Sequence, residues 1–195
     1  TDFAQDTRKK VIASERYQTL FGNIYQMRRD ADAKRSYKNT KGGWRKAIGT
    51  KGHITGKHSH LFIIDDPMNP RSANSQAERE SVNKWLNDTV PSRKTGDASV
   101  FIVVMQRLHE DDSTEQFLQT FKSVRHICLP AMLSDNVTPE YRNKYINGYL
   151  DPIRLGEDAC NNLKGKAAWS GQYMQAPAPD GGNIINPDWF FEFDY

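Results

Sequence analysis

The segment "HLFIIDDPMN" (residues 60–69) places four apolar residues in a row and ends them with two adjacent aspartates. A short, continuous apolar run such as Leu61–Ile64 is typical of a buried strand. Asp65 and Asp66 then follow side by side, although neighbouring carboxylates repel each other and a buried charge is costly without compensation. Either the pair forms a turn before Pro67, or it faces a cation.

Two more apolar runs, "ASVFIVVMQ" (98–106) and "VRHICLP" (124–130), predict two further strands. Helical patterns separate the three runs: "SANSQAERESVNKWLNDTV" (72–90) and "DDSTEQFLQTF" (111–121), the second capped by an aspartate. Alternating helices and continuously apolar strands are typical of a parallel sheet. We therefore expect an α/β fold with a mainly parallel sheet and helices on both of its faces.

The segments on either side of this pattern are less regular. A basic loop is expected up to Lys41, and the Gly-punctuated "TKGHITGKHSH" (50–60) predicts another loop. Because "QAPAPDGGN" (175–183) has no periodicity, we expect one domain over residues 1–175 and a linker over 176–195. The other expected elements are a helix over 3–22 capped by Thr1 or Asp2 and ended by Gly22, a short strand over 42–49, and helical segments over 138–150, capped by Thr138, and 156–168.

The composition indicates a cytoplasmic protein without a membrane span. The 195 residues have a mean hydropathy of −0.77, and their apolar runs are far shorter than a bilayer crossing requires. Cys128 and Cys160 are the two cysteines, and Cys128 lies in an apolar stretch that favours a buried thiol over a disulfide. The chain opens with Thr1 and no signal-like segment, which suggests a sequence cut at its front.

The net charge of +3 is unevenly distributed. Residues 1–60 hold 14 Lys and Arg against 5 Asp and Glu, a net charge of +9, whereas residues 61–195 hold 13 against 19, a net charge of −6. A basic first third indicates contact with phosphate or nucleic acid. A solvated surface without a partner is the alternative interpretation.

Polar side chains follow two of the predicted strands at the end where ligands bind in open parallel sheets. Asp65 and Asp66 end one strand, and Gln106 and Arg107 end the next. His109, Glu110, Asp111 and Asp112 come directly afterwards. Two consecutive strand tips thus carry acids, an amide and a cation toward one edge of the sheet.

Four apolar residues followed by Asp-Asp have the form of the second nucleotide-binding motif of P-loop ATPases. In such a site Asp65 would hold Mg²⁺, and Asp66 would orient or deprotonate the attacking water. Arg107 could sense the γ-phosphate, with Gln106 between the metal site and the moving parts. The alternative for Arg107 is a salt bridge to a neighbouring acid, and for His109 a capping or hydrogen-bonding role is favoured over metal ligation.

The first nucleotide-binding motif, G-x-x-x-x-G-K-[ST], does not occur in these 195 residues. "TGKHS" and "KGKAA" lack both its glycine spacing and the hydroxyl after the lysine. If the chain is an ATPase of this class, the phosphate-binding loop lies upstream of Thr1. The fold would then be a P-loop NTPase domain that is incomplete at its N-terminus, and the fragment alone should hydrolyse ATP poorly.

Several ordered segments together resemble a known family. They are "GHITGKHSHLFIIDDPMNPRSANSQAERESVNKWLNDTVPSR", "VFIVVMQRLHEDDS", "ICLPAM" and "WSGQYMQAPAPDGGNI". In this order and spacing they resemble the large subunit of the tailed-phage terminase, the DNA-packaging motor. The resemblance covers nearly all of residues 1–195.

The resemblance implies an ATPase domain followed by a metal-dependent nuclease domain with a ribonuclease H-like fold, which would begin where this chain stops. It implies ATP as substrate, Mg²⁺ as cofactor, and ATP-driven packaging of double-stranded DNA. The implied partners are the portal protein and the small terminase subunit. A ring-shaped homo-oligomer in the host cytoplasm, docked transiently at the procapsid portal, is also implied.

The resemblance also assigns roles to individual residues. Asp65 matches the Mg²⁺ position, and Asp66 is the expected catalytic base with Glu110 in reserve. Gln106 and Arg107 fall in the segment that couples hydrolysis to movement, although the family often has Thr-Arg-Trp-His where this chain reads Gln-Arg-Leu-His. This departure leaves the role of Gln106 open.

Two further sets of residues are weighed against the resemblance. Lys57 lies where relatives carry arginine; it could reach a neighbouring subunit's nucleotide, but a surface lysine is favoured. Asp188, Glu192 and Asp194 near the C-terminus are interpreted as surface acids, because a nuclease needs carboxylates gathered from well-separated strands.

Two other functions compete with the motor. A self-sufficient metal nuclease would use Asp65 and Asp66 together with the Glu110–Asp112 cluster, and would require both acid groups to converge. A non-catalytic DNA-binding module would rely on the basic first third, and its salt-sensitive DNA binding would survive alanine at Asp65 and Asp66.

Overall fold

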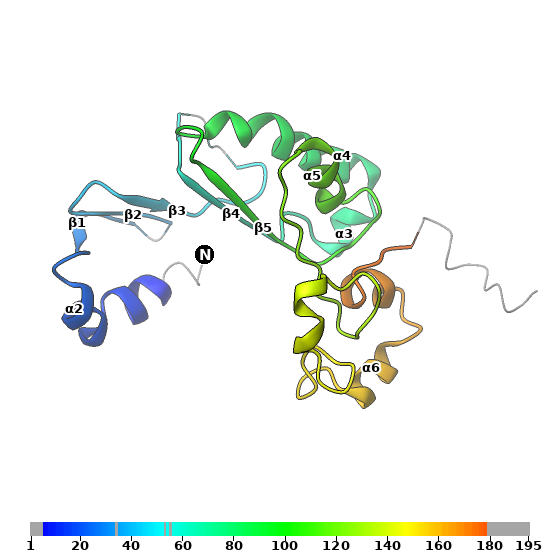
Figure 1. Cartoon of the computed structure of the whole chain (residues 1–195). Coiled ribbons are helices and arrows are strands. Elements are labelled where there is room, and N and C mark those ends of the chain that lie inside the picture. The colour runs from blue at the N-terminus through cyan, green and yellow to red at the C-terminus, as the bar shows by residue number, and fades with distance from the viewer. Residues whose placement is uncertain (1–5, 34, 53, 55, 179–195) are drawn as a thin grey trace, which may run out of the picture. The chain divides into compact units, whose positions relative to one another are not determined.

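Figure 1 shows the computed structural model, which describes residues 6–33, 35–52, 54 and 56–178. The chain divides into two compact units, Thr1–Thr55 and Gly56–Tyr195. The predicted linker at 176–195 lies almost entirely outside the described residues.

The first unit begins with two helical segments, η1 (Thr7–Ile12) and α2 (Glu15–Phe21). The single helix predicted over 3–22 is therefore wrong in its middle. Ser14 leaves the helical conformation at φ −68°, ψ 146°, and its hydroxyl accepts a hydrogen bond from the Tyr17 N–H at 3.3 Å. A serine in this conformation is a favoured N-cap, so it begins a second helix. Gly22 is the C-cap, as predicted, whereas the expected caps Thr1 and Asp2 lie outside the described residues.

A three-stranded antiparallel sheet follows, in the order β1 (Met27–Ala33), β2 (Ser36–Asn39) and β3 (Trp44–Lys46). The prediction of a basic loop up to Lys41 is therefore wrong. The strands escaped detection because their polar composition carries no clear apolar alternation. They are held instead by a turn in which the Asn39 carboxamide oxygen accepts hydrogen bonds from the N–H groups of Lys41 and Gly43. The short strand predicted over 42–49 is confirmed over the three residues of β3.

The centre of the second unit is a parallel pair of strands, β4 (Leu61–Asp65) and β5 (Val100–Val104). Their register runs from Leu61 opposite Val100 to Asp65 opposite Val104. Both strands and their parallel direction are confirmed, and the second unit mixes helices with a small parallel sheet. On one face the rings of Phe62 and Phe101 stack with their centroids 4.9 Å apart.

Helices connect the two strands and follow the second one. The helix predicted over 72–90 is present but interrupted after Ala73, and the helix predicted over 111–121 is α5, with Asp112 as its N-cap. Buried side chains on these helices include Val82, Leu86 and Phe117. The helical segments in chain order are α3 (Pro70–Ala73), α4 (Gln76–Lys84), η2 (Trp85–Thr89), η3 (Pro91–Arg93) and α5 (Ser113–Thr120).

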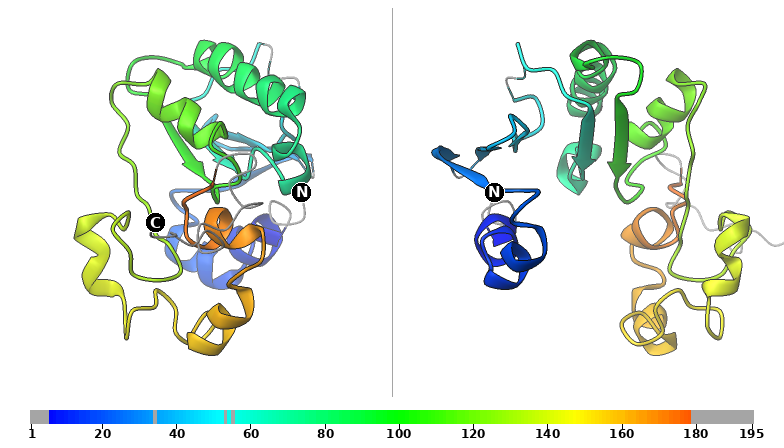
Figure 2. Two further views of the ribbon diagram at one scale, coloured as in Figure 1. Left: turned by 90° about the vertical axis from the view of Figure 1, so that its right-hand side faces the viewer. Right: turned by 60° about the vertical axis from the view of Figure 1, so that its left-hand side comes forward.

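The other face of the β4–β5 pair is exposed. Its apolar side chains are between 44 and 66% exposed, and α4 and α5 lie together on one side of the strands (Figures 1 and 2). The prediction of helices on both faces is therefore wrong for the described part of the chain. Strands this apolar are normally covered on both sides. The exposed face consists of Leu61, Ile63, Val100, Ile102 and Val104.

The third predicted strand, over 124–130, is not a strand in this structure. Its backbone instead pairs with a later loop: the Cys128 N–H donates to the Thr138 hydroxyl at 2.7 Å, and the Thr138 N–H donates to the Cys128 carbonyl at 3.1 Å. The segment nevertheless leaves Val124, Ile127 and Leu129 at least 37% exposed. Its composition is that of a strand, but no described strand lies beside it to complete a ladder.

The remaining elements are short. The helical segment predicted over 138–150 is a 3-10 turn, η4 (Pro139–Lys144), and the one predicted over 156–168 is confirmed as α6 (Glu157–Leu163). The last element is η5 (Trp169–Tyr173). Among the described residues, no helix combines the length and the apolar character that a membrane crossing requires.

Candidate functional site

The carboxyl ends of β4 and β5 lie directly beside each other. Asp65 pairs with Val104, and the Asp66 N–H donates to the Val104 carbonyl at 2.9 Å, so the ladder continues one residue past β4. The chain then leaves β5 through Gln106 and Arg107. The predicted meeting of two polar strand tips at one edge of the sheet is therefore observed in the backbone.

The two aspartates differ in backbone conformation. Asp65 ends the strand, whereas Asp66 has a positive φ of 40°, a region that side chains other than glycine, asparagine and aspartate rarely adopt. Conformations of this kind cost about 1–3 kcal/mol and occur preferentially at functional sites. Buried Pro67 and Met68 follow at once and fix the turn behind the pair.

The carboxylates of Asp65 and Asp66 are chemically available. Both residues are exposed, and within the described part of the chain neither side chain has a hydrogen-bond or ion-pair partner. Mg²⁺ is commonly held by one or two carboxylates together with substrate phosphates. The donor set at the β4 tip therefore fits such a site. It does not by itself form a full cage, since no cluster of three His, Cys, Asp or Glu that could hold a metal occurs among the described residues.

Arg107 is engaged inside its own loop. Its Nε donates to the Asp112 carboxylate at 3.0 Å, and one terminal nitrogen lies 3.4 Å from a Glu115 carboxylate oxygen. Only 14% of its side chain is exposed. The structure thus shows the salt bridge to neighbouring acids that was the alternative interpretation of this residue.

Asp112 organises the loop after β5. Its two carboxylate oxygens accept hydrogen bonds from the N–H groups of Leu108, His109, Thr114 and Glu115, in addition to the Arg107 guanidinium. The residue is fully buried. One carboxylate therefore caps α5 and at the same time holds the loop that begins with Gln106. The cap is as predicted from the sequence, whereas the contacts to the preceding loop were not predicted.

A distant segment clamps the same loop. The Gln175 side-chain oxygen accepts a hydrogen bond from the Arg107 N–H at 3.1 Å, and Gln175 itself has a positive φ of 55°. Gly171 packs so closely that an added Cβ would lie 3.0 Å from the Arg107 carbonyl oxygen. Sequence reasoning missed both residues, because a contact across 68 positions leaves no local signal.

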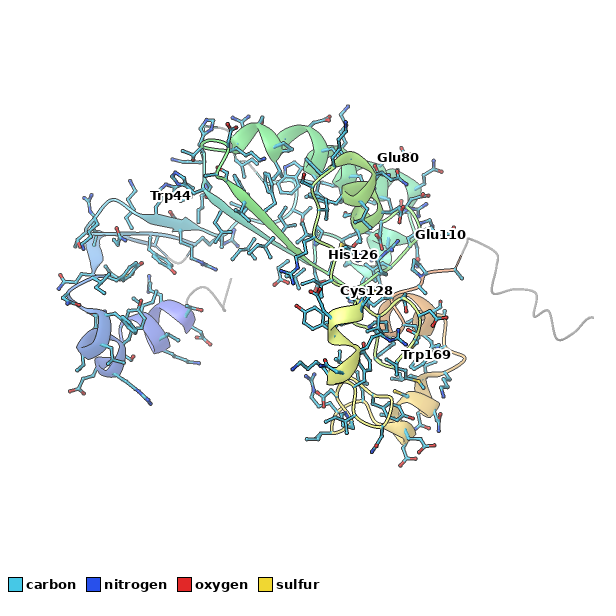
Figure 3. The ribbon with its side chains drawn as sticks, in the orientation of Figure 1. Trp44, Glu80, Glu110, His126, Cys128 and Trp169 are labelled. Atoms are coloured by element: carbon cyan, nitrogen blue, oxygen red, sulfur yellow. The ribbon has the colours of Figure 1, made fainter. Side chains whose placement is uncertain are left out.

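The remaining predicted site residues are spread out. Glu110 is exposed on the loop before α5 (Figure 3), and its carbonyl, not its carboxylate, faces Arg107 at 3.4 Å. Lys57 is exposed and precedes Ser59. The backbone of Ser59 forms a parallel β-bridge with that of Lys94, ahead of β5. Lys57 therefore lies before the amino end of β4, whereas the aspartates lie at its carboxyl end.

His109 and Cys128 are both partly or fully shielded from solvent. His109 is buried, and its Nδ1 accepts a hydrogen bond from the Asp111 N–H at 3.0 Å, in agreement with the predicted hydrogen-bonding role. Burial raises the pKa of the Cys128 thiol, with the positive charge of Arg107 opposing part of this effect. Cys128 and Cys160 are both free thiols, as expected.

Comparisons with known proteins add no family assignment. No model of a known protein family matches the chain, and no curated protein matches it.

Proposed function

We propose that this chain is the Mg²⁺-binding and coupling part of a P-loop-class motor ATPase, a terminase large subunit that packages double-stranded phage DNA. One observation carries the proposal. Asp65 ends a parallel strand and Asp66 follows it, immediately beside the strand that leads into Gln106 and Arg107, and neither carboxylate has a partner among the described residues. In open parallel sheets this edge is where ligands bind.

Each residue has a defined part in this proposal. Asp65 holds the metal ion, and Asp66, turned out of the strand by its positive φ, orients the attacking water. Bound there, Mg²⁺ would neutralise charge on the nucleotide's phosphates. Arg107 and Asp112 hold the loop after β5 in one conformation, so that a shift at the strand tip moves the whole loop.

The proposal requires a phosphate-binding loop from outside these 195 residues. Two features of the second unit support an additional strand and helix in the complete protein. One is the exposed apolar face of β4 and β5, and the other is the apolar segment 124–130, which has no strand partner among the described residues. Strands so apolar would not be left open to water in a finished sheet.

The same geometry disfavours a self-sufficient metal nuclease. That function needs the Glu110–Asp112 cluster to converge on Asp65 and Asp66. Asp112 is fully buried, and both of its oxygens already accept hydrogen bonds from the protein. Metal ligation by Asp112 would therefore disrupt the cap of α5.

Mg²⁺-dependent ATP hydrolysis by the full-length gene product tests the proposal. Asp65→Asn and Asp66→Asn should each abolish hydrolysis without loss of folded structure by circular dichroism. Asp97→Asn is the matched control, because Asp97 is exposed in the loop before β5, at the opposite end of the sheet. If the wild type does not hydrolyse ATP, or if neither asparagine substitution changes the rate of hydrolysis, the motor assignment loses its chemical basis.

A further inference from the structure

A second feature of the molecule, in the first unit, is not used by the proposed ATPase site. The small antiparallel sheet lies in a segment, residues 1–55, that holds 13 Lys and Arg against 5 Asp and Glu. Its third strand, β3, is exposed at all three of its positions. Because all three side chains of this strand reach solvent, apolar burial alone does not account for its composition.

The strand register sorts these side chains onto two faces. Lys38 pairs with Trp44, and Ser36 pairs with Lys46. Because paired residues and residues two apart share a face, Lys38, Trp44 and Lys46 stand on the same side of the sheet. Diagonal neighbours of this kind have their Cα atoms about 7–8 Å apart. The result is a compact surface with an aromatic side chain between two cations.

The opposite face has a structural role instead. There Tyr37 is 4% exposed, and the Arg45 guanidinium lies over its ring, 5.9 Å from the centroid. This cation–π contact accounts for one of the basic residues of the hairpin. Figure 3 shows Trp44 on β3, and this indole is 42% exposed. The two faces of the sheet therefore differ: one anchors the fold and the other remains open.

The open face and its adjoining turn expose three lysines. Lys38 and Lys46 are exposed, as is Lys41 in the turn between β2 and β3. Within the described residues none of these three lysines forms an ion pair. By contrast, Arg125 and Arg107 in the second unit both pair with acids. Lys38 and Lys46 on the face of Trp44, with Lys41 in the adjoining turn, make a surface of positive potential suited to a dense row of phosphates.

We propose that this face, formed by Lys38, Trp44 and Lys46 together with Lys41 of the adjoining turn, binds the phosphate backbone of double-stranded DNA. Lysine is a point charge that contacts phosphate without reading base identity, so binding is independent of sequence. A single-stranded partner is disfavoured, since such sites stack successive bases on several aromatic side chains and this face offers Trp44 alone. The inference deepens the proposed function, because a packaging motor must hold its duplex.

The decisive measurement is the salt dependence of duplex binding, followed by fluorescence anisotropy without nucleotide or Mg²⁺. Each phosphate contact contributes about 0.9 to the slope of log K against log salt concentration. The variant Lys38→Ala/Lys41→Ala/Lys46→Ala should therefore bind more weakly and lose between about two and three units of slope. Arginine at the same three positions should restore both affinity and slope.

A charge-matched control separates this surface from a general loss of positive charge. Lys122→Ala/Lys144→Ala/Lys166→Ala removes the same charge from exposed positions of the second unit and should leave the slope nearly unchanged. Trp44→Ala should weaken binding without altering the slope. Equal effects of the two triple variants, or tighter binding to single strands, RNA or anionic vesicles than to duplex, would overturn the proposal.

The outcome is independent of hydrolysis. Asp65→Asn should bind duplex like the wild type, because the aspartate pair has no part in this surface. Duplex binding that depends on the three lysines in a protein without ATPase activity would leave this inference standing and remove the proposed function. ATP hydrolysis without duplex binding that depends on the three lysines would leave the proposed function standing and remove this inference.

Discussion

The two sheets of this molecule show opposite relations between composition and burial. The β4–β5 pair is built from continuous apolar runs, yet one of its faces is open to solvent. The β1–β3 sheet is polar and basic, yet it buries Tyr37 and is held by a hydrogen-bonded turn. Apolar composition thus reveals where a strand will form, whereas register and turn chemistry decide whether a polar segment becomes one.

The largest effect is expected from the buried carboxylate beside the parallel pair. Asp112→Ala removes the acceptor for five donors and leaves the Arg107 Nε without its carboxylate. Breaking a buried ion pair in this way costs about 3–5 kcal/mol. Urea unfolding of the second unit should show this loss as a lower midpoint.

Asp111→Ala provides the matched comparison, because Asp111 is adjacent but exposed. Its effect on the free energy of unfolding should stay within about 0.5 kcal/mol. Similar losses in the two variants would contradict the organising role assigned to Asp112.

The exposed apolar face of β4 and β5 can be compared with the buried core of the same unit by the cost of truncating a side chain in each. Leu86→Ala empties a position that is 1% exposed and should cost about 2–5 kcal/mol. Ile63→Ala lies on the face that is open, at 66% exposure, and should cost below about 0.5 kcal/mol in this chain. A full-length gene product in which Ile63→Ala becomes as costly as Leu86→Ala would show that further sequence covers this face. Equal cost in the chain itself would contradict the exposed face.

The stability of the β1–β3 sheet should depend on the turn between β2 and β3. Gly42 has φ +87° in the β2–β3 connection, a conformation that alanine adopts only with strain. Gly42→Ala should therefore destabilise the first unit by about 1 kcal/mol. Gly49→Ala is the control, because Gly49 has neither a positive φ nor a nearby atom that a Cβ would meet. Hydrogen exchange of the β2 and β3 amides measures the difference, and equal exchange in the two variants would contradict the role of the turn.

The smallest effect concerns pH. Burial raises the pKa of the Cys128 thiol, so the unfolded chain ionises this group at a lower pH than the folded one. Its contribution to stability is then fully present below the ordinary thiol pKa of about 8.5 and is lost as the pH rises through the folded value. In a Cys160→Ser background, alkylation of Cys128 at pH 8 should be slower than that of an unfolded control. Equal rates would exclude a raised pKa.

The parts of the site that were predicted all carry local signals. The apolar runs at 61–65 and 98–106 indicated two strands, and the aspartate before "STEQ" indicated a cap. The site could not be predicted in full, because Gln175 and Gly171 reach Arg107 from far along the chain. The segment 124–130 was assigned as a strand from its apolar content alone, and a strand also needs a neighbour to accept its hydrogen bonds.

The sequence by itself determined where along the chain the two parallel strands lie, because a continuous apolar run is a property of neighbouring positions. It did not fix their ends, since β5 covers only Val100–Val104 of the predicted 98–106. It also determined that two aspartates and a Gln-Arg pair follow those strands. Only the tertiary structure decided that Arg107 turns to Asp112 and that Lys38, Trp44 and Lys46 share one open face. Register, ion pairing and the coverage of a face are set by which distant segments meet, and no local pattern encodes that choice.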